Sequence, residues 1–140
     1  MTENYKIIGN FIKDMSSETP DSPTYIYVGD KISKYKLNID INSKAVKKGI
    51  IEVNTIIRFS DQPEILKKAH FEITYTSIVK VDEKVSDKKE MEKIILCDVP
   101  NKIYPDLERI FLNLLTDSGY PGIKFEKKID FTELYKQRAN

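Results

Sequence analysis

Hydrophobic and polar residues alternate through the first half of the chain, which is the pattern of strands that bury one face. Three stretches show it, residues 35–41, 51–59 and 69–81, in which every second side chain is apolar except Thr55 and Ser77. An apolar stretch with β propensity, about residues 5–15, predicts one more strand. Four strands joined by short links predict an antiparallel meander, in which each strand pairs with its neighbour in the sequence.

Residues 19–30 depart from this alternation. Pro20 and Pro23 stand at the start of the segment, and two prolines disfavour both a regular helix and a central strand. We therefore expect an extended crossover loop. It carries three large side chains that need packing partners, Tyr25, Ile26 and Tyr27.

The hydrophobic period lengthens to that of a helix after the third alternating stretch. Asp87 and Glu90 fit a capping box at the start of a helix that Pro100 should break or kink. A second helical stretch with a broad apolar stripe follows and should end at Gly119. A further capping signal predicts a short terminal helix over about residues 131–138.

Strands followed by helices are typical of the α+β class. The 140 residues are enough to bury a core, and 40% hydrophobic with 32% charged residues excludes a disordered chain. We predict a single domain over residues 1–140. It should be a four-stranded antiparallel sheet with a kinked long helix and a short C-terminal helix packed on one face.

The charges nearly cancel, and this argues against polyanionic partners. Lys and Arg number 23 against 22 Asp and Glu, a formal net charge of +1, so we expect no nucleic acid and no strongly anionic membrane as partner. The N-terminus lacks the pattern of a signal peptide, and no apolar run approaches the ~20 residues of a membrane span. We expect a cytoplasmic protein without direct membrane insertion.

Candidate catalytic groups are few. One cysteine and one histidine exclude a Cys/His zinc site, and the glycines form no nucleotide-binding motif. His70 and Glu72 share one face of a predicted strand, so an enzyme or small-ligand binder built on them is one alternative. Cys97 lies among apolar residues and is expected to be a packed thiol. We predict no enzymatic activity, no cofactor and no metal.

Three blocks of the sequence carry motifs of one known family. Residues 11–23 contain an aromatic, a Lys-Asp pair and a Ser-x-Glu-x-Pro-x-x-Pro run. Residues 99–109 contain a helix-breaking proline, then an aliphatic-aromatic-Pro run followed by Arg. Residues 119–121 read Gly-aromatic-Pro, and residues 129–135 end on Asp-Phe-x-x-Leu-aromatic. With these blocks in order along nearly the whole chain, the sequence resembles SecB, a family of cytosolic protein-export chaperones.

The resemblance implies a function and an assembly. SecB proteins bind unfolded preproteins without ATP, keep them competent for translocation and pass them to the SecA ATPase, and they form homotetramers that are dimers of dimers. The family's SecA-contact positions fall on Asp14, Glu18 and Glu72, and its assembly-sensitive strand positions fall on Phe71, Ile73 and Tyr75. The expected client-binding groove consists of Tyr25, Tyr27, Ile32, Phe131, Leu134 and Tyr135.

Some features depart from the family pattern. SecB proteins are usually acidic and this chain is balanced; the family's paired strand glycines are Thr76 and Ser77 here, and Lys128 replaces a proline. The sequence ends at Asn140 without the long tail that supplies an extra SecA contact in the family. These departures lead to a second expectation, a SecB-like chaperone dedicated to one partner, such as an antitoxin, without SecA coupling.

Overall fold

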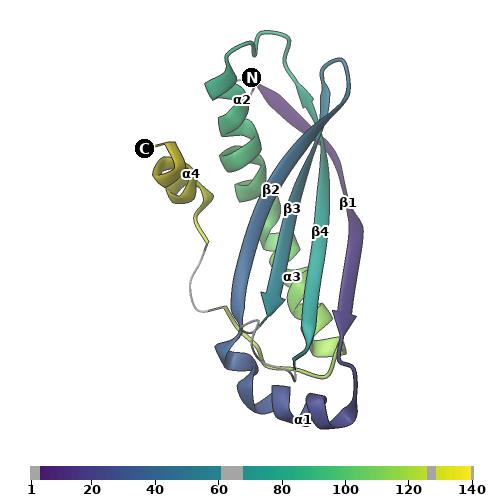
Figure 1. Ribbon diagram of the computed structural model, residues 1–140. Coiled ribbons are helices and arrows are strands. Elements are labelled where there is room, and N and C mark those ends of the chain that lie inside the picture. Colours follow the sequence, from purple (N-terminus) through teal and green to yellow (C-terminus); the bar gives the residue numbers. More distant parts are fainter. Residues whose placement is uncertain (1–3, 61–67, 126–128, 140) are drawn as a thin grey trace.

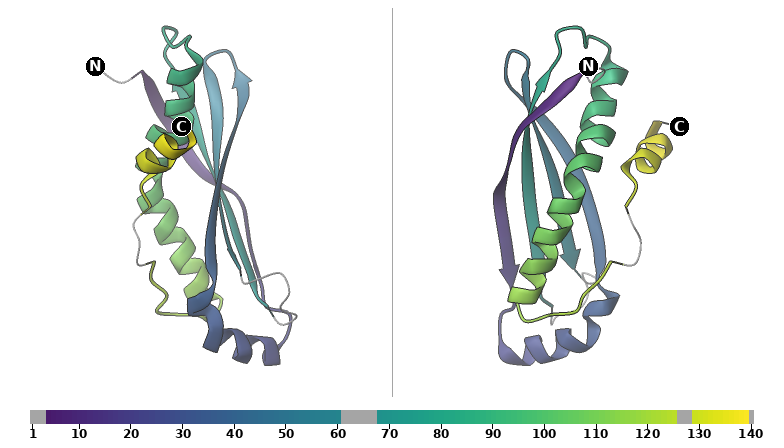
Figure 2. Two further views of the ribbon diagram at one scale, coloured as in Figure 1. Left: turned by 60° about the vertical axis from the view of Figure 1, so that its left-hand side comes forward. Right: turned by 180° about the vertical axis from the view of Figure 1, so that it is seen from behind.

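Four antiparallel strands form one sheet, and helices cover one of its faces (Figures 1 and 2). This computed structural model describes residues 4–60, 68–125 and 129–139. The strands are β1 (Tyr5–Glu18), β2 (Lys36–Lys47), β3 (Ile50–Ser60) and β4 (His70–Val81). The helical elements are α1 (Ser22–Lys31), the 3-10 turn η1 (Ile32–Lys34), α2 (Lys88–Lys93), the π-helical turn η2 (Ile94–Asp98), α3 (Val99–Asp117) and α4 (Phe131–Ala139). The predicted α+β architecture is confirmed.

The strand order is β1-β4-β3-β2, so the predicted meander is right for β2, β3 and β4 and wrong for β1. The first strand pairs with β4, from Tyr5 opposite Val81 to Glu18 opposite His70. The chain leaves β1 through α1, which crosses below the end of the sheet and delivers β2 to the opposite edge (Figure 1). Both β1 and β2 are therefore edge strands.

The crossover segment is helical, so the expectation of an extended loop is wrong. The Asp21 side chain caps α1 by accepting a hydrogen bond from the backbone N–H of Thr24 at 2.8 Å. Pro23 stands in the first turn, where a missing N–H removes no helical hydrogen bond. Pro23, one of the two prolines that argued for a loop, thus belongs to the first turn of a helix.

The predicted alternation gives the observed faces of the sheet. On β3 and β4 the residues turned towards α3 are buried, and Ile57, Phe71 and Ile73 are completely covered. They pack against Leu107, Phe111 and other residues of the apolar stripe of α3. The face opposite α3, called the open face here, carries polar residues such as Arg58 and Glu72.

The long helix is kinked next to Pro100, as predicted. The π-helical turn η2 directly precedes the first turn of α3, which contains this proline. The predicted N-cap Asp87 accepts from the backbone N–H of Lys89 at 3.1 Å, but the Glu90 carboxylate binds Asn4 instead of completing the capping box. The helix α3 ends at Asp117 with Ser118 as its C-cap, and Gly119 follows with a φ of +100°. The short link predicted between the second and third alternating stretches falls on residues 61–67, outside the described residues.

Candidate functional site

An apolar groove runs along the edge strand β2 on the side of the helices. Leu37, Ile39 and Ile41 point to this side and are only half-buried, because β2 is the last strand of the sheet and α3 lies over its centre (Figure 2). The outer backbone edge of β2 has no neighbouring strand among the described residues. An extended peptide adds to such an edge through main-chain hydrogen bonds.

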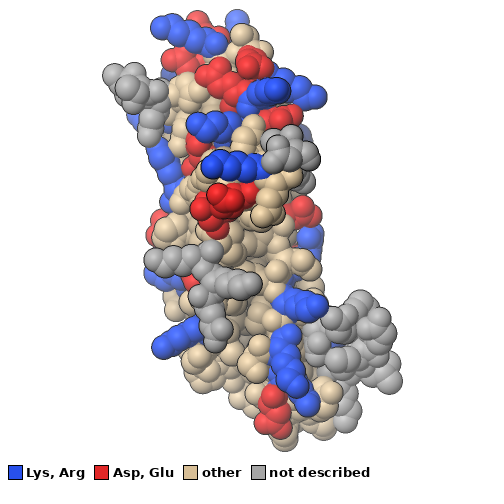
Figure 3. Space-filling model, turned by 90° about the vertical axis from the view of Figure 1, so that its left-hand side faces the viewer, with Lys and Arg blue, Asp and Glu red and all other residues tan. Residues whose placement is uncertain are grey.

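The groove consists of two adjacent clefts, which together we call the β2 groove. The lower cleft has a volume of about 790 Å³, and the upper cleft one of about 370 Å³. Leu37 lines the lower cleft and Ile39 the upper one, so the two follow each other along the strand. In Figure 3, which shows the molecule from this side, uncharged residues dominate the lower half. The apolar lining is Ile32, Tyr35, Leu37, Phe59, Ile123, Phe125 and Ile129 below, and Ile39, Ile41, Leu96, Phe131, Leu134 and Tyr135 above.

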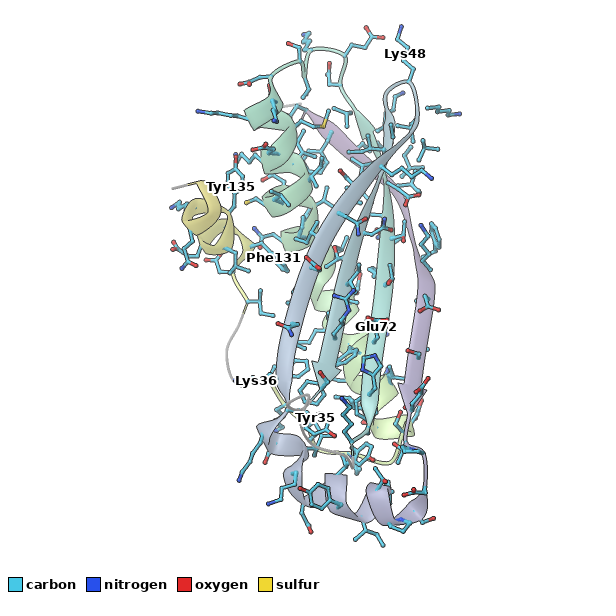
Figure 4. All side chains as sticks on the ribbon, in the orientation of Figure 1. Tyr35, Lys36, Lys48, Glu72, Phe131 and Tyr135 are labelled. Carbon is cyan, nitrogen blue, oxygen red and sulfur yellow. The ribbon has the colours of Figure 1, made fainter. Side chains whose placement is uncertain are left out.

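Helix α4 forms the outer wall of the upper cleft. Phe131 anchors it, being almost fully buried with its ring 5.5 Å from the ring of Tyr104. Leu134 is 47% exposed and available for contact, and Tyr135 points to the long helix, where its hydroxyl lies 3.4 Å from the Lys89 carbonyl (Figure 4). One face of α4 is therefore fixed, and another faces the cleft.

A small polar cluster attaches α4 to the kinked helix. Asn101 donates to the Thr132 hydroxyl at 3.0 Å and accepts from the backbone N–H of Phe131 at 3.2 Å. The buried Cys97 thiol lies 3.4 Å from the same hydroxyl. Cys97 is thus a packed thiol, as expected, and also a neighbour of the α4 attachment.

The predicted groove residues divide into two groups. Phe131, Leu134 and Tyr135 line the upper cleft, and the buried Ile32 lines the lower one. Tyr25 and Tyr27 line neither cleft. The Tyr25 ring instead packs 5.2 Å from the ring of Tyr120, and its hydroxyl donates to the Gly119 carbonyl at 2.8 Å. Tyr27 is exposed on α1.

Ile39, Ile41 and Leu96 of the upper cleft were not predicted as groove residues, and in the lower cleft only Ile32 was predicted. Strand alternation identified the two isoleucines only as members of a buried face. Their partial exposure follows from the position of β2 at the edge of the sheet, which alternation does not reveal.

The three carboxylates expected to contact SecA lie on the open face. Asp14 pairs with Thr74, Ser16 with Glu72, and Glu18 with His70, so the three side chains occupy successive rows of β1 and β4. Arg58 binds Glu72 through its Nε atom and approaches Asp40 at 3.5 Å. Arg58 therefore neutralises part of the negative charge that these carboxylates give to the open face.

The three residues expected at the oligomer interface are in the core of the single chain. Phe71 and Ile73 are completely covered and Tyr75 is 8% exposed. Burial raises the pKa of the Tyr75 hydroxyl, and the nearby Asp106 carboxylate adds to this effect. None of the three presents a contact surface, so any influence on assembly has to pass through the packing of β4.

Their neighbours on β1 are exposed instead. Ile12 pairs with Tyr75 and Met15 with Ile73, and both are almost half exposed on this edge strand. Ile8 and Phe11 on the same strand are also exposed, at 56% and 47%. An edge strand with such side chains is a site for association. The sequence analysis identified the strand as apolar but not as an edge.

His70 and Glu72 share the open face of β4, as predicted, but no cysteine lies beside them to complete a catalytic group. Glu72 is bound by Arg58 on the open face, while Cys97 is buried on the helix side. Within the described residues, no group of three or more His, Cys, Asp or Glu could hold a metal ion. None of the helices in the described part is long and apolar enough to cross a membrane.

Comparison with known sequences gives matches over the full chain. Residues 1–140 match the family model described as "Preprotein translocase subunit SecB". The chain is 96% identical to a putative protein-export protein SecB of Pelagibacter ubique, over 100% of both proteins. It is 24% identical over 130 residues to the protein-export protein SecB of Methylocella silvestris, covering 93% of this chain and 79% of the relative.

Two solved structures share the fold. One is the Rv1957 SecB-like chaperone of Mycobacterium tuberculosis in complex with a ChAD peptide from the Rv1956 HigA1 antitoxin, with a TM-score of 0.66 at 12% identity. That match covers 89% of this chain and 91% of the other. The second is a Streptococcus agalactiae protein of unknown function, with a TM-score of 0.52 at 7% identity, over 88% and 97% of the two chains.

Proposed function

This chain belongs to the SecB family of protein-export chaperones, and from this premise we propose that it binds unfolded preproteins in the cytoplasm without ATP, keeps them translocation-competent and delivers them to SecA. The β2 groove is the observation that supports client binding most directly. Apolar side chains of an extended client would enter its two clefts while the client backbone pairs with the edge of β2. Such binding needs no catalytic group, because mass action alone withdraws the client from aggregation.

The experiment is a light-scattering assay of a slowly folding preprotein without nucleotide. The unaltered protein should suppress aggregation, and Leu134→Ser should weaken suppression because it removes an exposed apolar side chain from the upper cleft. Ile26→Ser is the matched control, since Ile26 is 68% exposed on α1 and lines neither cleft. Equal effects of the two substitutions would exclude the β2 groove, and no suppression by the unaltered protein would exclude the chaperone activity.

Delivery to SecA is assigned to the acidic end of the open face. Asp14, Glu18 and Glu72 lie there in successive rows, away from the β2 groove, so client and SecA would bind at the same time. Asp14→Asn combined with Glu18→Gln should weaken SecA binding in a titration and leave aggregation suppression unchanged. The control is Asp82→Asn with Glu83→Gln, which removes equal charge at the opposite end of the sheet.

The proposed assembly is a homotetramer, a dimer of dimers. It is supported by the exposed apolar residues of β1, an edge strand that a second copy would cover. Light scattering of the purified protein should give the mass of four chains. Ile12→Asp should reduce that mass, whereas Ile26→Asp should not.

The second candidate function is a SecB-like chaperone for one dedicated partner, without SecA coupling. Arg58 favours it, because this residue neutralises Glu72 and Asp40 where SecA contact would need negative charge. The Mycobacterium tuberculosis chaperone with the same fold is bound to an antitoxin peptide. A pull-down that recovers one abundant partner, together with no SecA binding in the titration, would establish this alternative.

A further inference from the structure

Lysines from three strands line up at the upper end of the open face. The sheet register places Lys47 of β2 opposite Ile50, Ile50 opposite Lys80, and Lys80 opposite Lys6 of β1. Because opposed residues share a face, these side chains form one row across all four strands. We call Lys6, Lys47 and Lys80 the lysine row.

The lysine row is not explained by stability. All three lysines are exposed, and no ion pair between described residues involves any of them. Lys6 and Lys80 stand directly opposite each other, and like charges in this arrangement destabilise a sheet. An external anion would relieve this repulsion.

The surroundings make this end of the sheet positive as a whole. Lys48 lies at the tip of the β2–β3 hairpin, far from Tyr35 at the other end (Figure 4). Lys44 lies one row below Lys47, opposite Glu52, and the Glu52 carboxylate is already paired with Lys13 at 3.0 Å. The exposed lysines of residues 4–6, 44–50 and 80–87 are Lys6, Lys44, Lys47, Lys48, Lys80 and Lys84, against three exposed carboxylates, Asp82, Glu83 and Asp87.

The opposite end of the open face has the opposite sign. Its carboxylates are Asp14, Glu18, Asp40 and Glu72, against the cationic Lys36, Arg58 and Lys68. The open face is therefore polarised along the strands, although the net charge of the chain is only +1. Composition conceals this separation, because the two ends nearly cancel.

We propose that the lysine row binds the anionic surface of a phospholipid bilayer. The row runs across all four strands at one end of the sheet, so its charges can reach an extended surface together. Lysine is a hydrated point charge on a flexible stem, which suits a mobile layer of headgroups, whereas arginine provides the rigid fork used for bidentate recognition. The arginines of known position, Arg58 and Arg109, lie outside this end.

Apolar side chains beside the lysines support a bilayer over a soluble acidic partner. Val46 is 52% exposed at the hairpin, next to Lys47, and Ile50 stands half-buried within the row. Apolar side chains that enter the headgroup region next to lysines strengthen electrostatic adsorption. The acidic end of the open face would then point away from the lipid. This surface proposal is independent of the client-binding function.

The test is flotation of the unaltered protein with phosphatidylcholine vesicles, with and without phosphatidylglycerol. Low salt should give binding only to vesicles that contain phosphatidylglycerol, and high salt should abolish it because exposed charges are screened. Lys47→Gln with Lys80→Gln should weaken binding by about tenfold or more, since each lysine near an anionic surface contributes measurably. The matched control is Lys34→Gln with Lys68→Gln, two exposed lysines away from the row.

Each outcome decides the proposal. Absence of flotation with phosphatidylglycerol at low salt overturns it, as does an equal loss of binding in both double variants. Binding of heparin without flotation would assign the lysines to a soluble polyanion and also overturn it. Thermal unfolding followed by circular dichroism confirms that both variants are folded. Aggregation suppression should be unchanged in both, so a failure here is distinct from a failure of the chaperone proposal.

Discussion

Asn101 on α3 holds the first turn of α4 with both ends of its amide. Its Nδ2 donates to the Thr132 hydroxyl at 3.0 Å, and its Oδ1 accepts from the backbone N–H of Phe131 at 3.2 Å. Asn101 thus joins the kinked helix to the outer wall of the upper cleft through two hydrogen bonds, in addition to the contacts of Cys97 with Thr132 and of Tyr135 with Lys89. The position of that wall depends on this amide together with the buried Phe131 ring.

Replacing Asn101 should therefore loosen α4 without unfolding the sheet. Net contributions of about 1 kcal/mol for each of the two hydrogen bonds predict that Asn101→Ala raises hydrogen exchange in residues 131–139 by about 30-fold. Exchange in β3 and β4 should be unchanged. Asn113→Ala, a substitution at an exposed position of the same helix, is the control. Unchanged exchange in α4 would show that Phe131 alone holds the wall.

Gly119 is required by the crossover helix. Its φ is +100°, and a Cβ atom there would lie 2.6 Å from the Tyr25 ring. Gly119→Ala should lower the free energy of unfolding by about 1–3 kcal/mol, because both the backbone and the Tyr25 contact would be strained. Gly29→Ala should do the opposite, since Gly29 lies within α1 with open space around it, and alanine favours a helix by about 1 kcal/mol. Urea denaturation measures the free energy of unfolding of both variants. An equal loss of stability in the two would show that position 119 has no special requirement for glycine.

The parts of the fold that depend on local sequence were predictable. Alternation gives the buried faces of β3 and β4, because a period of two reports side-chain direction whatever the topology. Pro100 indicated the kink for the same local reason. The order of the strands was not predictable, since it depends on how α1 crosses the sheet. The indication of a loop from Pro23 was wrong, because a proline in the first turn of a helix is compatible with that helix.

The candidate site was partly predictable for a related reason. Phe131, Leu134 and Tyr135 follow a helix start signal and line the upper cleft. The β2 side of the groove depends on β2 being an edge strand, and the lysine row depends on register across strands far apart in sequence. Neither long-range fact is contained in hydrophobic periodicity.

Glu52 should make stability depend on pH in the acidic range. Hydrogen bonds from Asn54 and then Lys13 hold the pKa of this carboxyl below its ordinary value of 4.5. Since the folded pKa is the lower one, the stabilisation is complete above pH 4.5 and is lost as the pH falls through the folded value.

Glu52→Gln should therefore flatten the dependence of the unfolding free energy on pH below 4.5. The measurement is urea denaturation at a series of pH values, with Glu83→Gln as the control at an exposed position. The unfolding free energies of the two variants should differ most at neutral pH and become equal at acidic pH. A pH profile for Glu52→Gln identical to that of the unaltered protein would show that the carboxyl gains nothing from its partners.

Two buried threonines on opposite faces of the sheet should respond oppositely to the same substitution. Both are completely covered, but Thr76 donates to Asn54 Oδ1 at 2.6 Å, whereas the Thr55 hydroxyl has no hydrogen-bond partner among the described residues. Thr76→Val should lower the free energy of unfolding by about 1–3 kcal/mol, because it leaves the Asn54 Oδ1 atom without a hydrogen-bond donor. Thr55→Val should be neutral or stabilising by up to about 1 kcal/mol, because it removes a buried hydroxyl that forms no bond. Urea denaturation of the two variants measures the difference, and a destabilised Thr55→Val would mean that a bound water satisfies this hydroxyl in solution.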